Sequence, residues 1–334
     1  MDQNTKINID LLSPKAVTAK AESIGVKKAN YNLRTTVMLG ILAGVFIAFA
    51  GEFYTMVTFD ARVGSSIAKL LGGIAFSLGL ILVVIAGAEL FTGNTLLVIA
   101  YMTGKITQRK LLRNWGLVYI GNLIGALGVV FLVYYGQQWH LGKFAFAAQS
   151  LNIGLGKVKY DFMTALIRGI LANSLVVLAV WLSYSGRTVT DKVLAIIFPV
   201  TAFVASGFEH SIANMYFVPF ALLLKTQPEA LAAFAKAFPG VDLAPLTLGN
   251  FLVNNLIPVT IGNIIGGSVF VGLAYWFVYL HRYKSESGES QRIPGPVLGL
   301  WPKPAKKEEI KYEYRLSGPE KGSADSGPEG GSPD

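Results

Sequence analysis

The sequence predicts an all-α membrane protein with six transmembrane helices, arranged as an inverted repeat of three plus three, in which the second and fifth helices are broken. Three observations lead to this prediction. Of the 334 residues, 52% are hydrophobic and only 15% are charged, six long apolar runs follow one another, and the two halves share motifs in the same order. A soluble protein of this size needs a more polar surface. The lipid bilayer is therefore the expected solvent and partner of the chain.

The apolar runs each reach the length of about 20 residues that a helix needs to cross a bilayer. They cover residues 36–59, 70–103, 114–136, 161–184, 193–224 and 248–280. Two of them, 70–103 and 193–224, exceed the length of one straight span, and glycine and polar residues interrupt them near the middle. These two runs are predicted to be broken helices.

Basic residues recur in every second connection between the runs. They precede the first run and follow the second, fourth and sixth, as Lys15, Lys20, Lys27, Lys28, Arg34, Lys105, Arg109, Lys110, Arg113, Arg187, Lys192, Arg282 and Lys284. Since cytoplasmic loops are enriched in Lys and Arg, this pattern predicts that both termini are cytoplasmic. It also accounts for most of the net charge of +9 without a nucleic-acid partner. The absence of cysteine excludes disulfides and thiolate metal ligands.

The chain is predicted to have three parts. Ser13 followed by Pro14 is typical of a helix start, so residues 1–33 are expected to form a cytoplasmic N-terminal element with an amphipathic helix through about Asn30. This helix is either a plain interfacial anchor or a gate. Residues 34–283 form the six-helix transmembrane domain. Residues 284–334, rich in Gly, Ser, Pro and charge, are predicted to be a disordered cytoplasmic tail.

The repeat is visible in two pairs of motifs. GILAG at 40–44 recurs as GILAN at 169–173, and YIGNLIGALGVVF at 119–131 recurs as TIGNIIGGSVFVG at 260–272. Because each half has three spans, the halves have opposite orientations in the membrane. Folds of this kind place the substrate path between the repeats, at their broken helices. The interruptions at 87–95 and 206–214 should therefore face one another.

The second interruption, SGFEHSIAN, places Glu209 and His210 side by side at bilayer depth. Such residues are expensive in a membrane and indicate a functional site. Of the three histidines, only His210 lies in mid-membrane, because His140 falls in an outer loop and His281 at the end of the last span.

Four motifs, GAELFTGNT, SYSGR, SGFEHSIANM and IPVTIGNIIGG, resemble in order and spacing those of the formate–nitrite transporter family of bacterial inner-membrane channels, and its formate channels in particular. The resemblance covers about residues 8–282. It implies an aquaporin-like fold, a homopentamer with one pore per protomer, and a multi-pass protein of the bacterial inner membrane. It also implies passive or proton-linked conduction of formate or a related small monovalent anion, with nitrite or hydrosulfide as the alternative substrate. No cofactor or metal is implied.

The resemblance assigns roles to polar residues of the pore. His210 matches the family's single pore histidine, set between two hydrophobic constrictions, and Thr92 matches the threonine that faces it. Glu209 is expected to orient the ring or handle protons, or else to hold the broken loop. Asn173 and Asn263 match asparagines near the centre, which either donate to an anion or tie down a loop.

Further residues match the constrictions and vestibules of the family. The constriction residues are Phe76, Leu80, Leu90 and Phe203, for which ordinary core packing is the alternative. Lys157 and Lys28 match lysines of the outer and inner vestibules, where a positive field would concentrate anions. Simple snorkelling to the interface is the alternative for both lysines.

Glu52 and Arg168 are two charges that the resemblance does not explain. They fall in repeat-related spans near the outer half and could pair with each other. Glu52 is otherwise expected to face the protomer interface or the lipid headgroups.

Other function classes fit the sequence less well. A membrane enzyme would need a metal or nucleophile site, yet the chain has no Cys, no HExxH motif and no second histidine near His210. A pore of the water or glycerol type would carry an Asn-Pro-Ala motif, which does not occur.

Energetics favour neutral passage of a carboxylic acid. A charge at the bilayer centre costs about 3 to more than 10 kcal/mol, whereas protonating an acid with a pKa near 4 at pH 7 costs about 4 kcal/mol. We therefore expect formate to take a proton, from His210 or a water chain, and to cross as formic acid. In the competing mechanism, protonated His210 stabilises the anion.

Overall fold

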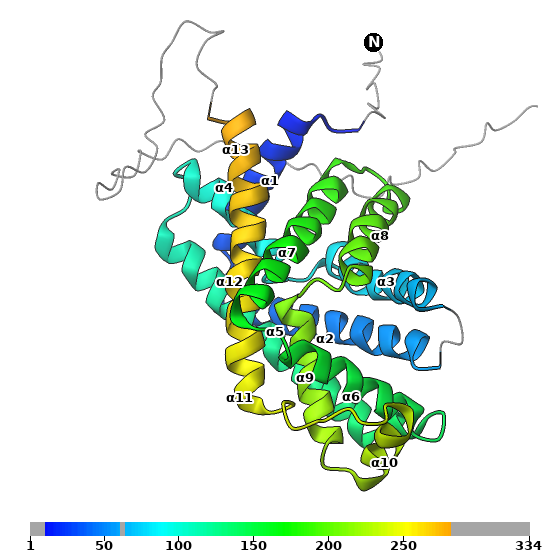
Figure 1. Cartoon of the computed structure of the whole chain (residues 1–334). Coiled ribbons are helices and arrows are strands. Elements are labelled where there is room, and N and C mark those ends of the chain that lie inside the picture. The colour runs from blue at the N-terminus through cyan, green and yellow to red at the C-terminus, as the bar shows by residue number, and fades with distance from the viewer. Residues whose placement is uncertain (1–10, 61–63, 282–334) are drawn as a thin grey trace, which may run out of the picture.

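The computed structural model describes residues 11–60 and 64–281, and every regular element in these ranges is helical (Figure 1). The first half contains α1 (Pro14–Ala29), α2 (Leu33–Thr58), α3 (Ser65–Leu82), the π-helix η1 (Val83–Gly87), the 3₁₀-helix η2 (Gly93–Leu96), α4 (Leu97–Met102) and α5 (Gln108–Tyr135). The predicted tail at 284–334 lies outside the described residues.

The second half begins with a short 3₁₀-helix and ends in one long helical column. Its elements are η3 (Gln138–His140), α6 (Ala145–Val158), α7 (Phe162–Ser185), α8 (Val189–Ala205), α9 (Ser211–Leu224), α10 (Pro228–Ala237), α11 (Leu248–Asn250), η4 (Phe251–Leu256), α12 (Ile257–Ile265), η5 (Gly266–Leu273) and α13 (Ala274–Tyr279). Figure 1 shows α11, α12 and α13 stacked end to end, with π-helical turns η4 and η5 joining them.

The six predicted spans are all present. In the described part of the chain, five helices are long and apolar enough to cross a membrane: Leu33–Thr58, Ser65–Gly87, Gln108–Tyr135, Phe162–Ser185 and Leu248–Tyr279. The remaining span is divided between α8 and the short apolar helix α9. The prediction of six spans is confirmed.

Both predicted breaks lie at glycines with left-handed backbone. Gly87 has φ +83° where η1 ends, and Gly207 has φ +69° between α8 and α9. Glycine adopts this conformation without the steric cost that a Cβ brings. The helices restart at η2 after the first break and at α9 after the second. The prediction that the second and fifth spans are broken is confirmed.

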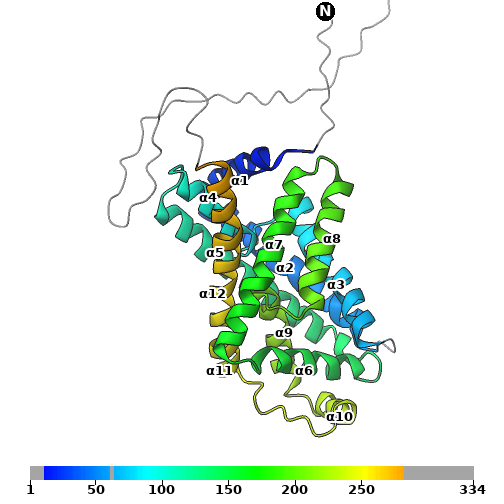
Figure 2. The same cartoon turned by 45° about the horizontal axis from the view of Figure 1, so that its top comes forward.

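The predicted helix at the N-terminus is α1. Ser13 caps it by accepting a hydrogen bond from Ala16 N, and Pro14 is its first residue. The sequence did not predict α6. This helix precedes the first span of the second half, just as α1 precedes the first span of the first half. Figure 2 shows α1 lying across one end of the helix bundle and α6 across the opposite end. The inverted repeat therefore extends beyond the three spans of each half and includes these two helices.

Glycines allow the first span of each half to pack closely against the third. On α2, a Cβ added at Gly44 would lie 2.1 Å from the carbonyl oxygen of Asn122 on α5. In the second half, a Cβ added at Gly262 of α12 would lie 2.2 Å from the carbonyl oxygen of Leu166 on α7. Small residues at such crossings let backbones approach and gain van der Waals contact, which drives helix association in lipid.

Candidate functional site

The two interruptions meet as predicted, and His210 joins them. His210 is the N-cap residue of α9, where its Nδ1 accepts a hydrogen bond of 3.1 Å from Ala213 N. Its Nε2 lies 2.9 Å from Oγ1 of Thr92, which belongs to the other interruption. Since Nδ1 accepts, a neutral ring carries its proton on Nε2 and donates it to Thr92. His210 therefore has a structural role as a cap in addition to its contact across the break.

Aromatic rings enclose His210 on one side. The Phe203 ring stacks on the imidazole with centroids 5.9 Å apart, and Phe76 meets Phe203 edge to face at 6.0 Å. Both phenylalanines are buried, as are Leu80 and Leu90. The four predicted constriction residues are thus in the apolar core, and their role in a constriction stays a prediction.

A cavity of about 80 Å³ reaches from Lys157 to His210. This volume exceeds the space that one water molecule needs. Besides these two residues, its lining consists of Tyr54, Phe76, Ile153, Phe203, Val204, Gly207, Phe208, Ala213, Asn214 and Phe217. Phe76, Phe203 and His210 are thus all part of the cavity wall.

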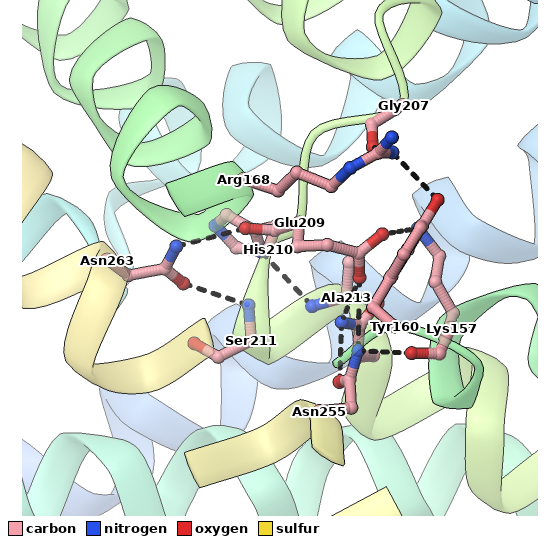
Figure 3. Close-up of polar contacts among 11 residues, drawn as sticks. Lys157, Tyr160, Arg168, Gly207, Glu209, His210, Ser211, Ala213, Asn255 and Asn263 are labelled. Carbon is pink, nitrogen blue, oxygen red and sulfur yellow. Dashed lines mark hydrogen bonds and ion pairs between the residues drawn. The ribbon is translucent and has the colours of Figure 1, made fainter. Parts of the chain in front are cut away.

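Glu209 is the centre of a buried polar cluster beside this cavity (Figure 3). Its Oε1 forms an ion pair of 2.9 Å with Nζ of Lys157, and its Oε2 accepts from Nδ2 of Asn214 at 2.8 Å and of Asn255 at 3.2 Å. Asn255, which lies in η4, also donates to the carbonyl oxygen of Lys157 at 2.8 Å and so joins α6 to the last span. We call Lys157, Glu209, Asn214 and Asn255 the α6 cluster.

The first half contains an equivalent cluster around Glu89. Lys28 of α1 forms an ion pair of 3.1 Å with Glu89, whose Oε2 accepts from Asn94 at 2.7 Å. Asn94 donates to Asn114 at 2.9 Å, and Asn114 donates to the carbonyl oxygen of Lys28 at 3.3 Å. We call these four residues the α1 cluster. In the α6 cluster Asn214 likewise donates to Asn255, at 2.8 Å. The two clusters thus share the same residue types and four equivalent contacts, by which each half holds its interruption.

Both cluster lysines lie outside the spanning helices and remain charged. Burial by itself would lower the pKa of the Lys28 and Lys157 ammonium groups, but the adjacent carboxylates of Glu89 and Glu209 raise it above the ordinary value. Lys157 also lines the cavity, and the vestibule roles of both lysines stay predictions.

The side chain of Asn263 is hydrogen-bonded to the backbone on both sides of His210. Its Nδ2 donates to the carbonyl oxygens of Gly169 and Glu209 at 2.8 and 3.0 Å, and its Oδ1 accepts from Ser211 N at 2.9 Å. All of its hydrogen-bonding groups are thus used by backbone. Asn122 makes the same three contacts in the first half, to Gly40, Glu89 and Phe91.

Asn173 also connects elements of the two halves. Its Nδ2 donates to the carbonyl oxygen of Asn263 at 2.5 Å and to the carbonyl oxygen of Thr92 at 3.3 Å. Its Oδ1 is buried and has no hydrogen-bond partner within the described residues. Asn173 therefore contacts the backbone of Thr92, while His210 contacts its hydroxyl group.

The suggested pairing of Glu52 with Arg168 is wrong. The Glu52 carboxylate accepts a hydrogen bond from Gln138 of η3 instead. Arg168 donates from Nη1 to the hydroxyl oxygen of Tyr160 and the carbonyl oxygen of Gly207. The two side chains are held by different neighbours because Glu52 lies beside the loop after α5 and Arg168 lies beside the second break.

Six site residues were not singled out from the sequence: Glu89, Asn94, Asn114, Asn122, Asn214 and Asn255. The repeat itself carried the signal, since aligning the two interruptions places Glu89 with Glu209 and Asn94 with Asn214. Within the parts of the chain that the structure describes, no three His, Asp or Glu side chains come together in a way that could hold a metal ion.

Comparison with known proteins gives concordant matches along most of the chain. A family model described as formate/nitrite transporter matches residues 15–277. The chain is 47% identical to the formate channel FocA of Escherichia coli K12 over 276 residues, which are 82% of this chain and 96% of the relative. It is 41% identical to FocA of Haemophilus influenzae, with 81% of this chain and 96% of the relative covered.

A solved structure has the same fold. It is described as a pentameric formate channel with formate bound, and it superimposes with a TM-score of 0.68 at 46% sequence identity. The match covers 74% of this chain and 98% of that one. The likeness thus extends over nearly the whole of the solved protein.

Proposed function

The chain belongs to the formate/nitrite transporter family, and we propose that it is a channel that conducts formate across the bacterial inner membrane. The observation that carries this proposal is the His210–Thr92 hydrogen bond, which joins the two broken spans next to a small cavity. The names of the relatives with 41% and 47% identity support formate as the substrate. A cavity of about 80 Å³ has room for an ion of a few atoms.

We propose further that formate crosses as formic acid and that the proton comes from water in the cavity. His210 is neutral while Nδ1 accepts from Ala213 N, so its one ring proton is on Nε2. Neutral imidazole is a poor proton donor at pH 7, because loss of its one N–H proton would leave an imidazolate anion. Supply of the proton through a water chain avoids this cost. The role of His210 is then to exchange its hydrogen bond with Thr92 for one with the substrate.

The competing mechanism requires a doubly protonated His210 that stabilises the formate anion. A proton on Nδ1 would face the N–H of Ala213, and the cap of α9 would be lost. This cost supports the neutral route as the preferred one.

We propose a homopentamer with both termini in the cytoplasm. The pentameric assembly of the solved relative supports the first part. Exposed basic residues at the end of the bundle that carries α1, among them Lys27, Arg34, Arg109 and Lys110, support the second. Cross-linking of the purified protein tests the assembly, and protease accessibility in oriented vesicles tests the topology.

Flux measurements on proteoliposomes test the substrate and the mechanism together. Vesicles of purified protein would receive formate, nitrite, hydrosulfide or glycerol under a pH gradient, with internal pH and membrane current recorded at the same time. Neutral passage predicts fast formate uptake that alkalinises the outside without current, whereas anion passage predicts current. Fast nitrite or hydrosulfide flux without formate flux would move the chain to another branch of the family, and glycerol flux would contradict an acid channel.

The variant His210→Ala tests the central residue, with His140→Ala as the matched control in the loop between α5 and α6. Formate flux should fall in the first variant and stay unchanged in the second. Equal flux in both would limit His210 to its capping role.

A further inference from the structure

We propose that Arg168 supplies the uncompensated positive charge that draws anions to the cavity between Lys157 and His210. In the sequence analysis, Lys28 and Lys157 were expected to provide the positive field that concentrates anions. The inference rests on the proposed function, since a field of this kind matters for a channel that takes up small anions. It is carried by the charge balance at the second break, by the partners of the guanidinium and by its position against the cavity wall (Figure 3).

The charge of Lys157 is neutralised where it stands. The Glu209 carboxylate lies 2.9 Å from its Nζ, and the Glu209 side chain is only 1% exposed. From a few ångströms away, an ion pair of this kind is a dipole whose field falls off faster than that of a single charge. Lys157 by itself therefore adds little to the attraction of an anion in solution.

Arg168, in contrast, has only neutral partners among the described residues. Its Nη1 donates to the Tyr160 hydroxyl oxygen at 2.7 Å and to the Gly207 carbonyl oxygen at 3.0 Å. The guanidinium carbon lies 4.2 Å from the centroid of the Tyr160 ring. The arginine is half-buried, and the N–H groups on Nε and Nη2 have no partner in the described part of the chain. The group is thus held in place with its full charge and with free donors.

The guanidinium lies directly behind the wall of the cavity. Gly207 is part of that wall, and a Cβ added to it would be 3.6 Å from Nη1 of Arg168. The charge therefore contacts a neutral residue of the cavity wall. The two remaining charged residues of the α6–α7 turn, Lys159 and Asp161, are exposed and of opposite sign. The net charge next to the cavity is therefore set by Lys157, Glu209 and Arg168, and it is one positive charge.

The first half of the chain provides an internal comparison. Glu209 N donates to the carbonyl oxygen of Arg168 at 3.3 Å, and Glu89 N donates to that of Leu39 at 3.1 Å, so Arg168 and Leu39 occupy equivalent positions. The α1 cluster is electrically balanced by Lys28 and Glu89 and has an apolar residue where the α6 cluster has Arg168. The charge of Arg168 is thus an addition to the contacts that the two clusters share. The first half forms its break without such a charge.

Charged thiol reagents measure this field without any transport. The chain contains no cysteine, so Ile153→Cys would place one thiol in the cavity lining. The rates of modification by an anionic and a cationic methanethiosulfonate would be compared, because their ratio cancels changes in the reactivity of the thiol itself. A unit charge about 10 Å away in water predicts that Arg168→Gln lowers the anionic-to-cationic ratio by about fourfold at low salt. Arg168→Lys should retain the ratio of the parent.

The same series separates charge from structure. Glutamine can still donate to the Gly207 carbonyl oxygen but has no charge. Lysine keeps the charge but cannot reproduce the guanidinium's geometry toward Tyr160 and Gly207. A ratio that falls equally in both variants would assign Arg168 to loop geometry and overturn the proposal, as would a ratio that does not change in Arg168→Gln. At 1 M salt the Debye length is about 3 Å, so the difference between the variants should disappear. Its persistence would also contradict a field effect.

Formate flux provides the functional measurement. At low ionic strength and low formate concentration, Arg168→Gln should slow uptake several-fold and flatten its salt dependence, with the maximal rate preserved. If the parent protein conducts no formate, the proposed function fails, yet the reagent ratio still decides whether Arg168 generates the field. An unchanged ratio together with normal formate flux would overturn the inference alone.

Discussion

The hydroxyl groups of Tyr119 and Thr260 lie 2.9 Å apart, and the two residues are counterparts in the repeat. Tyr119 opens the YIGN motif of α5, and Thr260 opens the TIGN motif of α12. A contact between equivalent positions of two halves is expected only close to the axis that relates them. The hydrogen bond therefore marks the place where the third and sixth spans meet across the pseudo-twofold axis.

Removal of this hydrogen bond should loosen the contact between the halves. We expect Tyr119→Phe and Thr260→Val each to destabilise the protein by about 0.5–1.5 kcal/mol, the net value of a single hydrogen bond. The double variant should be no less stable than the less stable single variant, because both changes remove the same interaction. Unfolding in mixed micelles measures these values, and strictly additive losses would mean that the two hydroxyls act independently.

The two Lys–Glu pairs should be of similar importance for stability. Glu89→Gln and Glu209→Gln each leave a lysine without its counter-charge in a buried place, for which a loss of about 3–5 kcal/mol is typical. Glu22→Gln is the matched control, since Glu22 pairs with Lys105, whose side chain is 55% exposed. That change should cost no more than about 1 kcal/mol. Thermal unfolding in detergent ranks the three variants, and equal shifts in all three would contradict the burial argument.

Capping and transport by His210 can be separated by the choice of replacement. Asparagine is a good N-cap residue and can accept from Ala213 N as the imidazole does, whereas alanine cannot. His210→Asn should therefore be about 1 kcal/mol more stable than His210→Ala. Both variants lose the ring contact with Thr92, so both should lose formate flux. If His210→Asn instead conducts formate almost as fast as the parent protein while His210→Ala does not, the imidazole acts only as a cap.

Two glycines of α5 provide a test of the close packing with α2. A Cβ at Gly125 would lie 2.1 Å from the Ile41 carbonyl oxygen, while a Cβ at Gly128 meets no atom within 4 Å. Gly125→Ala should thus force the helices apart and cost at least about 1–3 kcal/mol. Gly128→Ala should be neutral or slightly stabilising, because alanine is the better helix former. Similar unfolding behaviour of both variants would contradict the packing in the structure.

The elements of the fold that the sequence predicted are those set by local patterns. The six spans follow from the length of apolar runs, and the breaks follow from glycine and polar residues inside two of them. The start of α1 follows from Ser13 and Pro14. The two interruptions were expected to face one another because an inverted repeat brings them together. Each of these inferences uses only neighbours in the chain or the symmetry of the repeat, whereas the contact of Thr92 with His210 was expected from the resemblance to the family.

The contacts of the charged residues could not be predicted in this way. Lys157 and Glu209 are far apart in the chain. The helix α6 was not recognised as the counterpart of α1 because its 14 residues are too short for a span and because, unlike α1, it has no side-chain N-cap. Arg168 and Glu52 could be suggested as an ion pair because the sequence places both in the outer half of repeat-related spans. The structure directs them to Gly207 and Gln138 instead, since the direction of a long side chain depends on the groups that surround its helix.

By itself, then, the sequence determined the number of spans, their order, the two breaks and the residue at the centre, because hydropathy, backbone preference and repetition are properties of the chain alone. Only the tertiary structure decided which charges are neutralised, which asparagines hold the breaks and which cation keeps its field. A buried ion pair forms where two distant segments pack, and its partners are selected by distance and the local dielectric, neither of which is encoded in any single segment.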